Sequence, residues 1–391
     1  MDSLYLAWRY LCFYKVRSFI LIGCITVIAA LPLALEILVN ESERQLSLRA
    51  ESTPLLIGAK GSALDLVMNS LYFNDASPEP ITMAAVDQIL ESDLASPIPL
   101  SIRYRARGFP IVGTTLDYFD FRQLQVKNGQ HFSLIGQCLI GNEIARQLGL
   151  SPGDHLTSSP EAMFDIAGVY PLKMKITGVL AETNSADDRA IFVDIRTAWI
   201  ISGLGHGHTD LAKSTDESVI LKREAGNVTA NAKLMQYNEI TEDNIDRFHL
   251  HGDPATYPIT AVLAVPHDDK SGTILQGRYL DKDINYQIVT PAKVVDSLLA
   301  NIFRIRNVLD AVILLVGTAT LMALVLVFSL SLRLRSNEME TIFKLGSSRA
   351  TIARLLGAEI TIIGCLSGLL CLIIMLLLNH YDQELVRRLF I

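Results

Sequence analysis

Three runs of apolar residues constrain this chain more than any other feature of its sequence. Residues 19–39 contain one charged residue, Glu36, and residues 311–332 and 360–378 contain none. A helix of about 20 residues, rising about 1.5 Å per residue, covers the hydrocarbon core of a bilayer and satisfies its own backbone there. We therefore predict three transmembrane helices, at 18–39, 307–332 and 353–378.

The first run has an alternative interpretation as a cleaved signal peptide, because Arg9, Lys15 and Arg17 precede it. The apolar run is too long for a signal peptide, and Pro32 and Glu36 occupy the stretch where small residues would mark a cleavage site. An uncleaved anchor is the better prediction.

The distribution of basic residues predicts the topology. Residues 1–17 and the segment 333–352, between the second and third runs, are both net basic, and cytoplasmic segments carry such an excess. The chain has a net charge of −7, so the long stretch 40–306 is acidic and is placed outside the cytoplasm. We predict a multi-pass protein of a bacterial inner membrane with its large domain in the periplasm. The tail 379–391 is too short to cross again.

The stretch 40–306 alternates short apolar runs with helical patterns. Residues 55–57 predict a strand that a Gly turn joins to a helix over 64–73, and residues 138–141 predict a strand before a helix at 142–148 that Gly149 ends. The fold class is α+β, a mixed α/β domain on membrane anchors. We predict two lobes, with a Gly- and His-rich stretch, 202–213, before the second.

Catalytic signatures are missing from the sequence. The turn Gly58-Ala59-Lys60-Gly61-Ser62 has its Gly after the Lys, whereas a phosphate loop needs Gly directly before Lys and a hydroxyl directly after it. Neither G-x-S-x-G nor H-E-x-x-H occurs, and the lone outer cysteine, Cys138, fits a buried small residue. We assign no catalytic residue, no cofactor and no nucleic-acid partner to this chain.

Two His-x-His-x-Asp strings stand out in the outer domain. They contain His206 and His208, and His249 and His251. Histidines two apart on an extended segment point to the same side, so two such pairs can fill a zinc shell. Surface histidines in a solvated loop explain the same residues, and nothing in the sequence brings the two strings together.

The segment 333–352 carries an apolar stripe beside charged residues, which is typical of an amphipathic helix. Gly346 fits the end of this helix, and Ser347-Ser348 fit the N-cap of a helix that leads into the third run. The result is a helical elbow at the membrane surface. It can bind a cytoplasmic partner or rest on membrane lipid.

Residues 335–349, with the pattern R-x-x-E-x-x-x-x-x-x-L-G-x-[ST], resemble the segment after the second span of the MacB/FtsX/LolE-type ABC permeases. The outer domain is similar to the periplasmic core domain of that family in its turns and strands. The segments that carry this similarity are 58–62, 107–109, 111–114, 139–141, 148–154 and 176–180.

This resemblance implies a permease that forms a homodimer or a heterodimer with a related permease and binds a cytoplasmic ABC ATPase. The ATPase would bind the ATP, and its closure would be transmitted mechanically to the periplasmic domain for export or lipoprotein release. The implied coupling residues lie in the elbow: Glu338, Glu340, Phe343, Lys344, Leu345, Gly346 and Ser347. The family usually has a fourth span, for which this sequence has no run. The alternative function is a membrane-anchored regulatory or sensing module acting on an extracytoplasmic partner or a metal.

Overall fold

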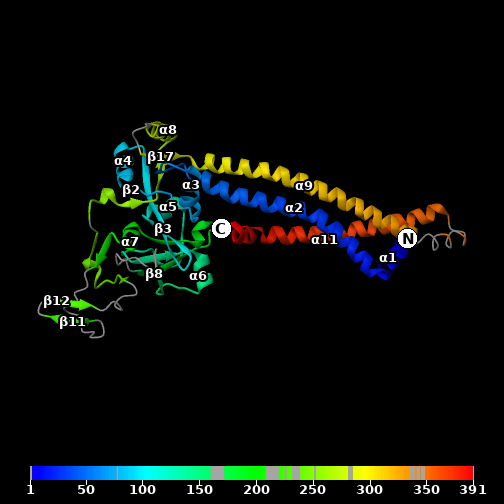
Figure 1. The fold of residues 1–391 in the computed structure, drawn as a ribbon, viewed down its shortest axis with the longest axis horizontal. Helices are drawn as coiled ribbons and strands as arrows, with labels where there is room; N and C mark the ends of the chain where they lie inside the picture. The colour runs from blue at the N-terminus through cyan, green and yellow to red at the C-terminus, as the bar shows by residue number, and fades with distance from the viewer. Residues whose placement is uncertain are drawn as a thin grey trace. The chain divides into compact units, whose positions relative to one another are not determined.

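The computed structural model describes residues 2–76, 78–159, 171–207, 220–224, 227–230, 238–250, 252–280, 285–334, 340, 344 and 348–390. The chain divides into two compact units. We call Met1–Gln45 with Leu298–Ile391 the helical unit, and Leu46–Ser297 the sheet unit. Figure 1 shows the elements of each.

Four helices make up the described part of the helical unit: α1 (Asp2–Phe13), α2 (Lys15–Glu51), α9 (Pro291–Leu334) and α11 (Arg349–Phe390). By length and hydropathy, α2 and the stretch Ala353–Leu378 of α11 can each cross a membrane. Within α9, Ala311–Met322 is a shorter apolar stretch. The first and third predicted spans therefore lie in helices of sufficient length, and the second stays a prediction.

Polar and apolar contacts join α1, α2 and α11 within the helical unit. Leu11, Leu21 and Ile363 form a small buried cluster. Arg17 forms an ion pair with the buried Glu359 at 3.6 Å, and the Thr26 hydroxyl donates to the backbone oxygen of Ser367. Polar groups in an apolar environment are retained when they are paired in this way.

A large mixed sheet forms the centre of the sheet unit. Within the described residues it has eleven strands, in the order β13-β8-β6-β9-β4-β3-β16-β1-β17, with β5 and β7 paired to β8. The pair β4–β9 is parallel, whereas β9–β6 and β4–β3 are antiparallel. Its strands are β1 (Leu55–Ala59), β3 (Ala95–Ala106), β4 (Phe109–Thr114), β5 (Val126–Gly129), β6 (Gln137–Ile140), β7 (His155–Thr157), β8 (Leu172–Leu180), β9 (Ile191–Asp194), β13 (Asn238–Glu239), β16 (Ala261–Pro266) and β17 (Tyr286–Val289).

Three two-stranded ladders accompany this sheet in the described residues: β2 (Ile81–Thr82) with β15 (Pro258–Ile259), β10 (Gly205–Gly207) with β14 (Phe248–Leu250), and β11 (Ile220–Glu224) with β12 (Asn227–Ala230). The described helices that lie wholly within the unit are α3 (Ala63–Tyr72), α4 (Ala84–Ser92), α5 (Asp117–Arg122), α6 (Asn142–Leu148), α7 (Ile195–Ile201) and α8 (Asp269–Arg278), with short 3-10 turns η1 (Ala186–Arg189), η4 (Ile245–Arg247) and η5 (Pro254–Thr256).

The local elements follow the sequence patterns. The Ser62 hydroxyl accepts from the Asp65 amide at 3.1 Å and caps α3, so the turn at 58–62 is a strand-to-helix connection, as predicted. Gly149 ends α6 in the left-handed conformation at φ 64°. Cys138 is buried, which confirms the interpretation of this residue.

Some boundaries differ from the predicted ones. The compact unit Leu46–Ser297 lies within the stretch 40–306, and its bounds are narrower because helices α2 and α9 each contribute residues to both units. That 40–306 is an outer domain stays a prediction. Helix α11 does not end with the apolar run at 378 but continues to Phe390, so the predicted tail is helical over most of its length. The expected two lobes stay a prediction.

Candidate functional site

The last turn of α2 brings a buried arginine into the sheet unit. Arg49 is 9% exposed, and the helix ends two residues later, before Thr53-Pro54. The hydroxyls of Ser52 and Thr53 donate to the backbone oxygen of Arg49 at 3.0 and 2.9 Å. These bonds satisfy a carbonyl that the helix end would leave without a partner.

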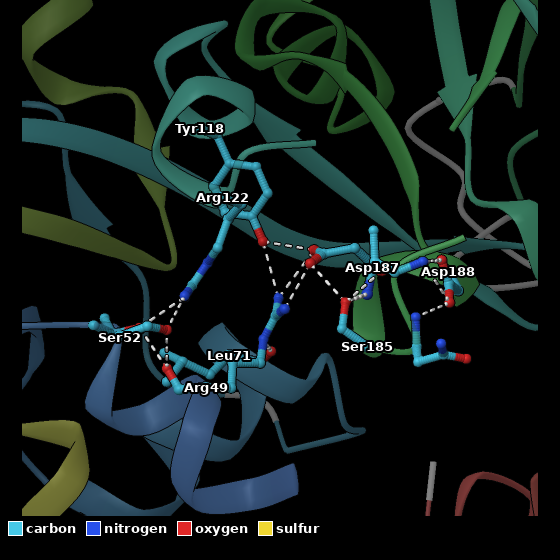
Figure 2. Close-up of polar contacts among 11 residues, drawn as sticks. Arg49, Ser52, Leu71, Tyr118, Arg122, Ser185, Asp187 and Asp188 are labelled. Carbon is cyan, nitrogen blue, oxygen red and sulfur yellow. Dashed lines mark hydrogen bonds and ion pairs between the residues drawn. The ribbon is translucent and has the colours of Figure 1, made fainter. Parts of the chain in front are cut away.

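The Arg49 guanidinium donates to groups from three other elements (Figure 2). It forms a two-pronged ion pair with Asp187 of η1, at 2.6 Å from Nη1 to Oδ2 and 3.0 Å from Nη2 to Oδ1. Nη2 also donates to the Tyr118 hydroxyl of α5 at 3.0 Å, and Nε donates to the backbone oxygen of Leu71 in α3. Forked arginine–carboxylate contacts of this kind are geometrically specific as well as strong.

The carboxylate of Asp187 is held from its other side. It is 1% exposed and accepts hydrogen bonds from the Tyr118 hydroxyl at 2.8 Å and from the Ser185 hydroxyl at 3.0 Å. Its neighbour Asp188 is not part of this contact and accepts hydrogen bonds from the backbone amides of Thr183 and Asn184. Both oxygens of Asp187 are therefore satisfied, as a buried carboxylate requires.

A second arginine holds the chain just beyond α2. The Arg122 guanidinium, on α5, donates to the hydroxyls of Ser52 and Thr53 at 2.9 and 2.7 Å. Its charge lies 4.9 Å from the ring centre of Phe121. Since Ser52 and Thr53 also bond to the Arg49 carbonyl, the two arginines belong to one network, which we call the α2 clamp: Arg49, Ser52, Thr53, Tyr118, Arg122 and Asp187.

An aromatic group surrounds the ion pair. The Arg49 guanidinium lies 5.3 Å from the ring centre of Phe73. The ring of Phe192, on β9, packs against Phe73, Tyr118 and Phe119, with ring centres 5.3 to 6.3 Å apart. These rings exclude water from the charges, which strengthens the attraction and makes an unpaired charge costly.

The surroundings shift the pKa values of the clamp. Burial alone would raise the pKa of Asp187, but the charge and hydrogen bonds of Arg49, with Arg122 and Tyr118, lower it below its ordinary value. Burial would lower the pKa of Arg49, but Asp187 raises it overall. Burial, with the charge of Asp187, raises the pKa of Tyr118 to about 12. The clamp therefore holds fixed charges at neutral pH and is suited to fastening chain segments, not to proton transfer.

The structure describes only part of the predicted elbow. Glu340 and Lys344 are exposed and form an ion pair at 3.0 Å, one helical turn apart. Ser348 precedes α11, and its hydroxyl accepts from the Thr351 amide at 3.2 Å, which confirms the predicted N-cap at that residue. The other predicted residues, Glu338, Phe343, Leu345, Gly346 and Ser347, lie outside the described residues.

Two of the four predicted metal ligands are brought together by the backbone. His206 of β10 and His249 of β14 are directly opposite each other in an antiparallel ladder. His208 and His251 lie outside the described residues. Within the part of the chain that the structure describes, no group of three or more His, Cys, Asp or Glu residues is placed to hold a metal ion.

The sequence patterns did not identify the α2 clamp. Arg49 follows Leu46 and Leu48 in a helix that is otherwise polar at its end, and Asp187 lies in a loop rich in charge, so each looks like a surface residue. The residues that pair are 138 positions apart. The one local signal was an arginine just before the end of a helix, a few residues before the chain becomes apolar again at residue 55.

Comparison with known protein families identifies the fold. The sequence profile of the MacB-like periplasmic core domain matches residues 20–234, which is more than half of the chain and includes the whole α2 clamp. The chain therefore belongs to the family of proteins with a MacB-like periplasmic core domain, as its resemblance indicated. None of the curated proteins matches the chain.

Three solved structures are similar to parts of the chain. The extracellular domain of the noncanonic ABC-type transporter YknZ from Gram-positive bacteria is 12% identical, with a TM-score of 0.33, and the match covers 60% of this chain and 98% of that one. The periplasmic region of MacB from Actinobacillus actinomycetemcomitans is 10% identical, with a TM-score of 0.35 and coverages of 63% and 94%. A permease-protein domain from Porphyromonas gingivalis is 13% identical, with a TM-score of 0.27 and coverages of 61% and 88%.

Breaking the ion pair from one side should destabilise the sheet unit. Asp187→Asn leaves Arg49 buried without its counter-charge, and we expect a loss of about 3–5 kcal/mol in the free energy of unfolding. Urea unfolding of the purified full chain in detergent measures this. The control is Asp194→Asn, which weakens a half-exposed pair with Arg196 and keeps a capping side chain, and should cost no more than about 1 kcal/mol. Equal losses in the two variants would contradict the assignment.

The clamp also predicts the acid response. Because the folded pKa of Asp187 lies below its ordinary value, its contribution is complete above about pH 4 and is lost as the pH falls through the folded pKa. The stability difference between wild type and Asp187→Asn should therefore be constant from neutral pH down to about pH 4 and shrink below it. Unfolding curves measured at several pH values test this, and a difference that grows on acidification would refute it.

Proposed function

We propose that this chain is the permease subunit of an ABC transporter of the mechanotransmission type. A separate cytoplasmic subunit hydrolyses ATP, and the resulting movement passes through the helical unit to the sheet unit in the periplasm. This movement drives export of a substrate or release of a lipoprotein. The subunit works as a homodimer or with a related permease.

The observation that supports this proposal most directly is the family match over residues 20–234, because the matched domain is a periplasmic domain of the MacB type. The match begins inside helix α2, at residue 20, and so includes most of a helix that is long and apolar enough to cross a membrane. A periplasmic domain that begins with a membrane helix suits a subunit that receives movement from the cytoplasmic side.

The elbow at 333–352 is the proposed binding site for the ATPase. It joins α9 to α11, and its described residues Glu340 and Lys344 are well exposed. Charged groups on an exposed helical turn can select a partner by charge complementarity and contribute little to the fold of their own chain.

Charge reversal tests this site. Glu340→Lys should reduce the amount of ATPase that co-purifies with the full chain by about tenfold or more, since like charges across an interface cost several kcal/mol. The matched control is Glu340→Lys/Lys344→Glu, which restores an ion pair in reverse order. If the ATPase reads the charges, the double variant stays defective. If both variants co-purify with as much ATPase as the wild type does, the elbow is not the binding site.

A second candidate function, metal sensing, is supported by the register of β10 and β14. Residues directly opposite each other in an antiparallel ladder share one face of that ladder, and His206 and His249 occupy such positions. Imidazole is a common zinc ligand, and further ligands would be needed to complete a tetrahedral site. His208 and His251 are the nearest candidates in the sequence.

Zinc titration distinguishes this function. If the His residues form a site, calorimetry on the full chain in detergent should show saturable zinc binding that His206→Ala and His249→Ala each weaken by about tenfold or more. The control variant is His155→Ala, since His155 lies on β7 beside Glu239 and outside both His strings. A flat trace with the wild-type chain would exclude metal sensing.

A further inference from the structure

We infer that the Arg49–Asp187 ion pair is the point at which displacement of helix α2 passes to the β-sheet of the sheet unit. This inference rests on the proposed function and deepens it. Arg49, Tyr118 and Asp187 are positioning residues, because they act on the chain segments that they join and on no substrate.

The first argument is the continuity of α2. The helix runs from Lys15 to Glu51 without a break and contains Pro32 as its one proline. From Leu33 to Glu51 the sequence has neither Pro nor Gly. Kinks in helices arise mostly at such residues, so the stretch from Leu33 to Glu51 is stiff along its axis, and displacement of the helix at Leu33 displaces Arg49.

The second argument is the number of elements that the helix end holds. Arg49 reaches α3 through Leu71, α5 through Tyr118 and η1 through Asp187. The turn before the last one of α2 is also held, because the Tyr72 hydroxyl donates to the backbone oxygen of Leu46 at 2.5 Å. If α2 shifted without these elements, a guanidinium and a carboxylate would be left buried and unpaired. That state is so costly that the elements follow the helix.

The third argument is the route from the clamp to the sheet. Asp187 lies in η1, and β9 begins at Ile191, four residues later. Strand β9 lies between β4 and β6 within the sheet, and its Phe192 packs on Tyr118 and Phe73. Movement of Asp187 therefore reaches an interior strand both along the chain and through side-chain packing.

The charged pair at this position has a property that apolar contacts lack. Well-packed apolar residues can replace a buried ion pair with little or no loss of stability, and often with a gain. Apolar contacts are not directional, however, so they allow the helix to slide or rotate against its neighbours. A forked ion pair fixes both the position and the rotation of the helix end.

The test uses the full chain in nanodiscs with the ATPase that co-purifies with it. Hydrogen exchange of backbone amides is measured without nucleotide and after trapping with ATP and vanadate. In the wild type, trapping should change exchange in α2 and in β9. In Arg49→Met/Asp187→Leu, the change in α2 should remain and the change in β9 should be lost.

Two controls separate coupling from folding. Ile89→Ala removes buried side-chain volume in α4, outside the clamp and outside the core that contains Ile191 and Val193 of β9, and should lower stability while keeping the response of β9. Arg49→Lys keeps the charge and loses the fork, so its β9 response should be smaller than that of the wild type. This variant also provides the measurement if the double variant does not fold.

The possible outcomes are distinct. A wild-type response in β9 that both clamp variants retain in full would overturn the inference and leave the proposed function standing. Loss of the response in Ile89→Ala as well would assign the effect to stability and would also overturn it. If trapping changes exchange nowhere in the wild type, the proposed function fails, and the inference fails with it.

Discussion

The sheet unit depends on one constraint, which is that the buried guanidinium of Arg49 must stay paired with the carboxylate of Asp187. Arg49 and Asp187 are both buried, and an aromatic group separates them from water. The attraction between the charges is strong there, and so is the penalty for separating them. Helix α3, helix α5 and turn η1 each contribute a group to this pair, so their places around the end of α2 follow from it.

The sheet gives this pair its structural importance. Strand β9 has a parallel neighbour, β4, and an antiparallel neighbour, β6, and is therefore an interior strand. Its Ile191 and Val193 belong to one apolar core, whereas Phe192, between them, joins the aromatic group beside the clamp. This alternation is what a strand with two covered faces requires. One short strand thus connects the charged pair with the apolar interior.

Local structure in this protein could be predicted from the sequence to a large extent. The strand at residue 55, the helix at 142–148 and the cap at Ser348 each depend on neighbouring residues, and all are present in the structure. The order of strands could not be predicted, because β1 pairs with β16 and β17, about two hundred residues away. The α2 clamp could not be predicted for the same reason, because its residues are far apart in the sequence. An arginine in a helix and an aspartate in a loop look like solvated surface residues until the fold brings them together.

The division between the two units falls inside a helix, at Gln45 and Leu46, and not in a loop. A fragment of the sheet unit that starts at its first strand would begin near Leu55 and would lack Arg49. Asp187 would then be a buried carboxylate without the charge of Arg49, and such a fragment should aggregate or take up a proton to fold. A fragment that retains the native electrostatics includes Arg49, and the final turn of a helix that is long and apolar enough to cross a membrane is therefore part of the sheet unit.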